Sequence, residues 1–389
     1  MEDFHFKLSQ TTSTNINLLR IYACQMVAIA HGLSLIMNLG ITIEIGKTAL
    51  EVFFLMSGIL TAYSLFNKKK DKKYNFKKYV INRFSRLYPP LIVVLIAVIF
   101  IDGFWMTFNE LDASVGAYNI QSFITSLFLL NDSAFGFPSF GSANPLWTLP
   151  LFWWMFMLLG WVMLGLKTIK KTYKYYIILG IFASLVLIVY CGPLYQEDLI
   201  SNIRLLLVWV SGIFILLLLK EFQKITQNKS FINTRAKTEL NLSQMQSYDF
   251  SFYKKLFNYS HIYGILSAFL FILAWINKLI TLDAYSMYHI MLVIFSVFFL
   301  FLYSQYTQFR YNNKFKKVVN FFSSYSYTLY ILHFSINHFF VPFKDTINPL
   351  LLFIIGWLLS NGLSILIALF TERKAKNIEN YLLKKFHLK

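Results

Sequence analysis

The sequence predicts an all-α integral membrane protein, a bundle of about ten transmembrane helices with both termini in the cytoplasm. Of its 389 residues, 57% are hydrophobic and only 14% are charged, whereas soluble chains carry about a quarter charged residues. Its apolar runs are long enough to cross a hydrocarbon core of about 30 Å. The basic residues gather in every second connection between these runs, which is the positive-inside pattern.

Ten runs are long enough to span a lipid bilayer, which makes that bilayer the first expected partner. We place them at 17–38, 46–66, 87–106, 145–166, 175–191, 203–219, 262–280, 285–303, 318–340 and 349–371. The apolar stretch Ile120–Leu130 is too short to cross. We expect it to lie in the outer interface or to re-enter from that side.

The charge distribution orients the chain. The connection 67–86 carries nine Lys or Arg and one Asp, while 107–144 carries three acids and no Lys or Arg. The net charge of +18 could suggest nucleic acid, but clusters separated by apolar runs indicate membrane orientation instead, so no nucleic-acid partner is expected. The two cysteines give no metal-ligand spacing, and no metal site is expected.

We divide the chain into three parts, with no domain outside the membrane that has its own core. Residues 1–16 form a cytoplasmic N-terminal segment, 17–371 the membrane domain and 372–389 a basic cytoplasmic tail. The polar stretch 220–261 is expected to be a cytoplasmic insertion joining two sub-bundles. The oligomeric state cannot be predicted from these patterns.

The first apolar run carries an arginine and a histidine on one face. Arg20 and His31 are 11 residues apart, about three helical turns or roughly 16 Å. A charge at membrane depth costs on the order of 3 kcal/mol, and such residues usually mark a functional path. A histidine here could also be a buried structural residue, but together with Arg20 it predicts a polar stripe that faces protein or a water-filled cavity.

The second run contains a carboxylate, Glu51, and the small pair Ser57-Gly58. Glu51 could orient a histidine or accept a proton, or its side chain could reach the outer interface. Ser57-Gly58 is expected to allow close helix contact.

Arg83 and Arg86 lie three residues apart at the predicted cytoplasmic mouth of the third run, so they share a helical face. Arginine binds phosphate through a planar fork, and the pair is a candidate clamp for a phosphorylated ligand. Anchoring by the positive-inside rule alone would also explain it. Pro89 and Pro90 are expected to restart the chain as it enters the membrane.

Two further polar groups of residues lie later in the chain. Asn144, Pro145, Trp147 and Thr148 open the fourth run, and Ser326, Tyr330, His333 and Asn337 form one stripe of the ninth. The chain thus has a second polar face with a second histidine.

In this order the motifs resemble the type-3 acyltransferase family, bacterial membrane O-acyltransferases that modify cell-surface glycans. They are Arg20 with His31, Glu51 to Gly58, Arg83 to Pro89, Pro145 to Leu149, and Ser326 to His333. The resemblance covers about residues 15–371 and implies a ten-helix bundle in the bacterial cytoplasmic membrane. It also implies transfer of an acetyl group from acetyl-CoA to a hydroxyl of a surface or lipid-linked glycan.

On this resemblance we expect His31, Arg20 and Glu51 to be catalytic. Arg83, Arg86 and Arg20 would bind acetyl-CoA, and Trp147, Asn144, Tyr330 and His333 would line the acceptor side.

One position departs from the family pattern, because Phe152 stands where members usually carry a glutamate. A member without catalysis is therefore one alternative. A transporter or flippase for a glycan or small amphipathic molecule is another, since ten spans with a polar interior also fit transport. Consumption of an acyl thioester would separate these functions.

Overall fold

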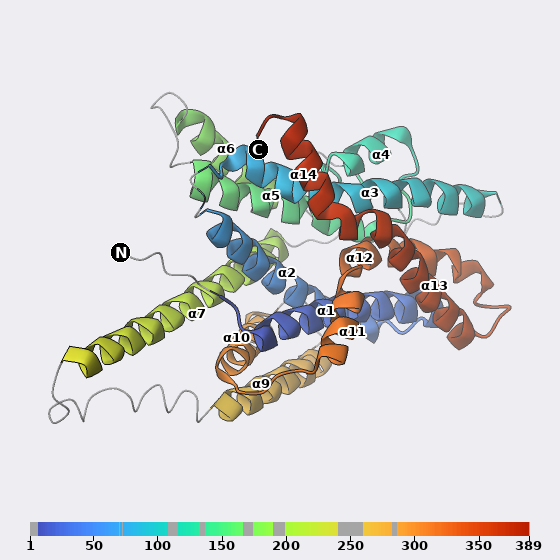
Figure 1. Ribbon diagram of the computed structural model, residues 1–389. Coiled ribbons are helices and arrows are strands. Elements are labelled where there is room, and N and C mark those ends of the chain that lie inside the picture. The colour runs from blue at the N-terminus through green and yellow to red at the C-terminus, as the bar shows by residue number, and fades with distance from the viewer. Residues whose placement is uncertain are drawn as a thin grey trace.

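The computed structural model describes residues 7–69, 71, 73–107, 116–132, 137–165, 174–189, 199–239, 260–281 and 286–388. Every regular element within these ranges is a helix, and eight helices are long and apolar enough to cross a membrane. The prediction of an all-α integral membrane protein is confirmed (Figure 1). The count of ten spans and the placement of both termini stay predictions.

The first two predicted spans form helices α1 (Gln10–Met37) and α2 (Ile41–Lys68). Helix α1 begins several residues before the predicted start because Ser9 caps it, accepting a hydrogen bond from the backbone amide of Thr12. It ends where Asn38 adopts a left-handed conformation with φ of 55°.

Helix α3 (Phe76–Met106) corrects one expectation. It begins at the Asn75 cap, whose side chain accepts from the Lys78 amide, and runs through Pro89 and Pro90 without a break. The prolines therefore do not restart the chain, and Arg83 and Arg86 lie within the helix.

The outer connection and the fourth span are built from short pieces. Helix α4 (Ile120–Leu127) has only eight residues and is closed by a capping box between Asn119 and Ser122. The fourth span then opens with a 3-10 turn η1 (Asn144–Trp147), continues as α5 (Thr148–Gly160) and ends in a π-turn η2 (Trp161–Gly165). Helix α6 (Lys174–Val189) follows within the predicted fifth span.

Helix α7 (Leu199–Glu239) is much longer than the predicted sixth span. Its final part covers 220–239 of the predicted insertion and extends beyond the neighbouring helices in Figure 1. The insertion's residues 240–259 lie outside the described residues. The chain continues with α9 (Ser260–Thr281) and α10 (Met287–Tyr306), which pack against each other.

The predicted ninth span, 318–340, is wrong as a single helix. It divides into α11 (Asn313–Ser323) and α12 (Ser326–Phe339). At the break, the Ser324 hydroxyl donates to the Phe321 carbonyl and the Ser326 hydroxyl donates to the Ser323 carbonyl. Such side-chain bonds compete with the helical ladder, which explains the interruption in this serine-rich segment.

Helix α11 has two unlike sides. Phe315, Val318, Phe321 and Phe322 are exposed, and lysines alternate with them in the sequence NKFKKVVNFFS. This composition is typical of a helix lying in a membrane interface.

The chain ends with four elements. The 3-10 turn η4 (Val341–Phe343) leads to α13 (Pro349–Phe370), and the turn η5 (Glu372–Lys374) leads to α14 (Ala375–Lys385). Helix α14 folds back onto α3. Part of the predicted tail 372–389 is thus an integral piece of the bundle.

Helix α12 is the centre of the molecule. Every residue from Ser326 to His338 is buried, and α12 packs against α1, α3 and α13. Helix α2 lies between α1 and α7. A Cβ atom on Gly58 would collide with the Trp209 carbonyl oxygen of α7, and one on Gly212 would collide with the Leu55 carbonyl of α2. The close helix contact predicted for Ser57-Gly58 is therefore made with α7.

Candidate functional site

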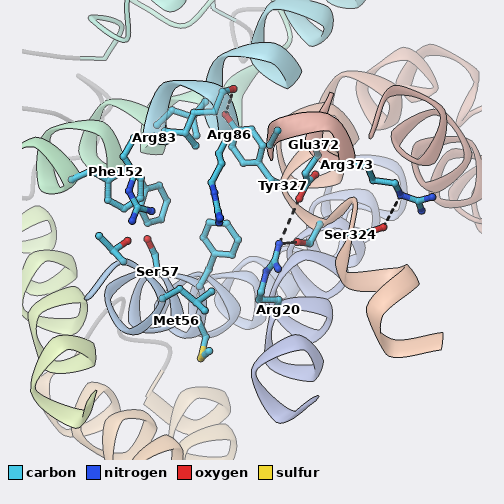
Figure 2. Close-up of a pocket in the computed structure, with 18 of the residues that line it drawn as sticks. Arg20, Met56, Ser57, Arg83, Arg86, Phe152, Ser324, Tyr327, Glu372 and Arg373 are labelled. Atoms are coloured by element: carbon cyan, nitrogen blue, oxygen red, sulfur yellow. Dashed lines mark hydrogen bonds and ion pairs between the residues drawn. The ribbon is translucent and has the colours of Figure 1, made fainter. Parts of the chain in front are cut away.

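A cavity of about 420 Å³ opens on the side of the bundle that the charge pattern predicts to be cytoplasmic (Figure 2). Residues from α1, α2, α3, α5, α12 and the η5–α14 segment contribute to its wall. Helices far apart in the sequence therefore build one site.

The cavity wall is rich in basic side chains. Arg20, Arg83 and Arg86, predicted from sequence to bind one ligand, all line it. Arg373 and Lys376 join them from the C-terminal segment, together with the acids Glu372 and Glu379. These four C-terminal residues were missed because sequence alone gave no sign that the tail returns to the bundle.

Arg83 is the most deeply placed of the cavity's arginines, with 6% of its surface exposed. Its guanidinium lies 5.2 Å from the Tyr79 ring centroid and 5.1 Å from that of Phe156. Within the described part of the chain, Nε and Nη2 have no hydrogen-bond partner. Buried charged donors normally find acceptors, so these groups are ready to bind an anion in the cavity.

Arg20 is held at the beginning of α12. Its Nη2 donates to the Ser326 hydroxyl over 2.9 Å and lies 3.5 Å from Oε1 of Glu372. The other oxygen of Glu372 accepts from the Thr328 amide and hydroxyl, at 3.2 and 3.1 Å. The carboxylate thus joins α1 to the first turn of α12, where free amides favour negative charge.

Part of the cavity wall is apolar. It consists of Phe53, Met56, Leu60, Leu87, Leu149, Phe152 and Phe156. Phe152, which occupies the unusual position noted in the sequence, stacks on Phe54 with ring centroids 4.1 Å apart. Its ring is packed as a hydrophobic wall residue.

His31 pairs with His333 across the α1–α12 interface. Nδ1 of His31 lies 2.8 Å from Nε2 of His333, and the two rings are within 4° of parallel. Arg20 also bonds to Ser326, and the Asn337 amide lies 3.4 Å from the Ala28 carbonyl. The polar stripe of α1 faces protein, as predicted, and meets the polar stripe of α12.

The histidine pair is not part of the cavity wall. The ring of Phe53, which does line the cavity, stacks on Tyr330 with centroids 5.0 Å apart. The Tyr330 ring is in turn 6.2 Å from that of His333. Tyr330 is fixed by a 2.9 Å hydrogen bond between its hydroxyl and that of Thr148. Two aromatic rings therefore separate the cavity from the histidines.

Glu51 lies elsewhere. Its Oε2 is 3.0 Å from Nε2 of His289 on α10, and both side chains are fully buried. His289 also contacts the Thr48 hydroxyl at 3.1 Å and the Ala274 carbonyl at 3.0 Å. Glu51 therefore contacts a histidine, but that histidine is His289, while the polar contact of His31 is with His333.

Trp147 and Asn144, predicted to face the acceptor, lie in η1 and are both partly exposed. The turn η1 packs against α12, and the next residue, Thr148, is the partner of Tyr330. Neither Trp147 nor Asn144 is among the residues that line the basic cavity.

A family model described as an acyltransferase domain matches residues 13–370. No curated protein and no solved structure matches the chain.

Proposed function

Because the chain belongs to the type-3 acyltransferase family, we propose that it transfers an acetyl group from acetyl-CoA to a hydroxyl of a cell-surface or lipid-linked polysaccharide. The proposed location is the cytoplasmic membrane of a bacterium. The family match supports membrane acyltransferase activity in general. The proposed donor and acceptor rest on the residues of the site.

The observation that supports the donor is the buried guanidinium of Arg83 in the basic cavity, whose Nε and Nη2 have no hydrogen-bond partner among the described residues. Coenzyme A carries phosphates, and arginine binds phosphate through charge-assisted, often bidentate hydrogen bonds. The first turn of α12 adds a helix N-terminus at the same wall. Arg83, Arg86, Arg20 and Arg373 would share the phosphates, with Glu372 releasing Arg20 as they bind.

The apolar part of the cavity wall suits the uncharged part of the donor. Leu149, Phe152 and Phe53 present hydrophobic surface in the direction of Tyr330. The thioester would advance along this wall while its phosphates stay at the arginines. The Phe53–Tyr330 stack must separate before an acetyl group can reach His31.

His31 would act as the general base. In the proposed step, a ring nitrogen of His31 takes the proton of the acceptor hydroxyl as its oxygen bonds to the thioester carbonyl carbon. The carbon–sulfur bond then breaks, and His31 returns the proton to the departing thiolate. The acceptor would approach past Trp147 and Asn144.

The central test measures thioester consumption by the protein in lipid nanodiscs. Acetyl-CoA labelled in the acetyl group is supplied with a polysaccharide fraction, and release of free thiol is followed together with label in the glycan. We expect both signals from the parent protein and a loss of at least about 100-fold in His31→Ala, in the range of general-base contributions. Full transfer by His31→Ala would overturn the base assignment. Transport of glycan without thiol release would favour the transporter.

The donor site is tested by Arg83→Gln. Loss of a charged donor costs about 1.5–3 kcal/mol, so the KM for acetyl-CoA is expected to rise roughly tenfold to 100-fold, since 1.4 kcal/mol is about a factor of ten. Arg310→Gln is the matched control, because Arg310 is exposed on the α10–α11 connection and does not line the cavity. An unchanged KM in Arg83→Gln, or an equal rise in both variants, would contradict the donor site.

A further inference from the structure

The hydrogen bonds of His333 determine where its ring protons lie. Nδ1 of His333 is 3.0 Å from the Leu329 carbonyl oxygen. A carbonyl oxygen accepts only, so this nitrogen must carry the hydrogen. In a neutral imidazole the second nitrogen is then an acceptor, and Nε2 of His333 presents a lone pair to its partner.

That lone pair points at His31. The nitrogens are 2.8 Å apart while the ring centroids are 5.1 Å apart, and the rings are nearly parallel. The rings therefore meet edge to edge, with the lone pair and the N–H in one plane. Since Nε2 of His333 accepts, Nδ1 of His31 must donate, and the unprotonated nitrogen of His31 is Nε2 on the far side of its ring.

We infer that His333 is a positioning residue that holds His31 in the tautomer with a free Nε2. This inference rests on the proposed function, in which His31 is the base, and it names the atom that takes the proton. The chain of bonds runs from the Leu329 carbonyl through His333 to His31. These bonds anchor His31 to the backbone of α12. They determine which ring nitrogen of His31 carries the proton, and they restrict the orientation of its ring.

The surroundings explain why the arrangement is stable. His333 is fully buried on α12, whereas His31 remains partly exposed. The ring of Phe334 contacts His31 edge-on, with centroids 5.3 Å apart. His333 is thus enclosed by protein, while part of the His31 side chain remains accessible.

Two substitutions separate positioning from simple packing. His333→Phe keeps an aromatic ring but offers no acceptor, while the amide of His333→Gln can accept from His31 and donate to Leu329. We expect kcat to fall about tenfold or more in His333→Phe, part of a general-base contribution, and to be largely retained in His333→Gln. The KM for acetyl-CoA should stay within about twofold in both, because His333 does not line the donor cavity. His261→Phe, at an exposed histidine, is the matched control.

The tautomer can be read without any activity. In nanodiscs, ¹⁵N-labelled histidine reports which ring nitrogen is protonated, and His31→Asn identifies the His31 signal among the seven histidines. We expect protonated Nδ1 and bare Nε2 in the parent and a mixture of tautomers in His333→Phe. A His31 signal protonated at Nε2 in the parent, or equal kcat in the Phe and Gln variants, would overturn the inference. If the parent consumes no thioester, the proposed function fails while the spectrum still decides the tautomer.

Discussion

Arg83 owes its position to two aromatic rings as well as to its charge. The ring centroids of Tyr79 and Phe156 lie 5.2 and 5.1 Å from the guanidinium carbon. Tyr79 is itself fixed, because its hydroxyl donates to the Phe156 carbonyl over 2.9 Å. A planar cation suits such a site, since a guanidinium stacks on rings and keeps several donors in a fixed plane. Charge alone therefore does not explain how the Arg83 side chain is held.

Arg83→Lys tests this point, because lysine keeps the positive charge but lacks the planar guanidinium group. We expect the KM for acetyl-CoA to rise several-fold, from the loss of stacking and of the two-pronged donor. Arg86→Lys should have the smaller effect, since Arg86 is exposed at the cavity wall. The test is to measure the KM for acetyl-CoA in both variants by varying the acetyl-CoA concentration. Equal KM changes would show that charge is all that the site requires.

Single residues also show what sequence could and could not reveal. The polar stripe of Arg20 and His31 was predictable because a helix repeats every 3.6 residues. The partner of His31 was not, because His333 lies 302 positions away and only the crossing of α1 and α12 brings it near. Glu51 is similar, since its contact with His289 depends on how α2 and α10 meet.

Among the elements, α12 departs most from the sequence prediction. Hydropathy indicates one span through 318–340, but hydropathy does not register that Ser323, Ser324 and Ser326 can bond to the local backbone. The break leaves α12 with only 14 residues and with its N-terminus at the cavity. A continuous helix would have offered no free amides to the cavity.

Glu372 compensates for the missing cap of α12. Its carboxylate accepts from the Thr328 amide and pairs with Arg20, so Glu372→Ala leaves a buried donor and a cation without their acceptor. We expect a loss of about 1–3 kcal/mol, seen as a lower midpoint in thermal unfolding of the protein in nanodiscs. Glu372→Gln, which keeps one carbonyl acceptor, should lose less.

Asp345→Ala serves as the control for that series, because Asp345 is exposed in the α12–α13 connection. If Glu372→Ala unfolds at the same temperature as this control, Glu372 does not stabilise the protein by capping α12.

At the scale of the whole molecule, the length of the apolar runs predicted many of the helices well. The helices α1, α2, α3, α9, α10 and α13 fall at predicted spans, because apolar length and loop charge are local properties of the sequence. The cavity is not local. It requires α14 to return to α3. The pair of Lys68 Nζ with Glu379 Oε1 at 2.9 Å also joins α14 to the end of α2.

The orientation of the bundle is tested by cysteine accessibility. The positive-inside pattern places Lys317 of α11 on the cytoplasmic side and Asp345 on the outer side. In intact cells, a membrane-impermeant maleimide should label Asp345→Cys and should label Lys317→Cys only after permeabilisation. The parent protein, with its two native cysteines, gives the background. The reverse labelling pattern would place the arginine cavity outside, where acetyl-CoA is absent.

The return of α14 to the bundle has a practical consequence for anyone expressing this protein. Lys376 and Glu379 line the cavity, so a fluorescent reporter fused behind Lys389 is attached close in sequence to a segment of the cavity wall. Such a reporter is useful for following the amount of protein made, and its removal restores the unmodified segment. Reporter fusions at that end should therefore be cleaved before any ligand is titrated.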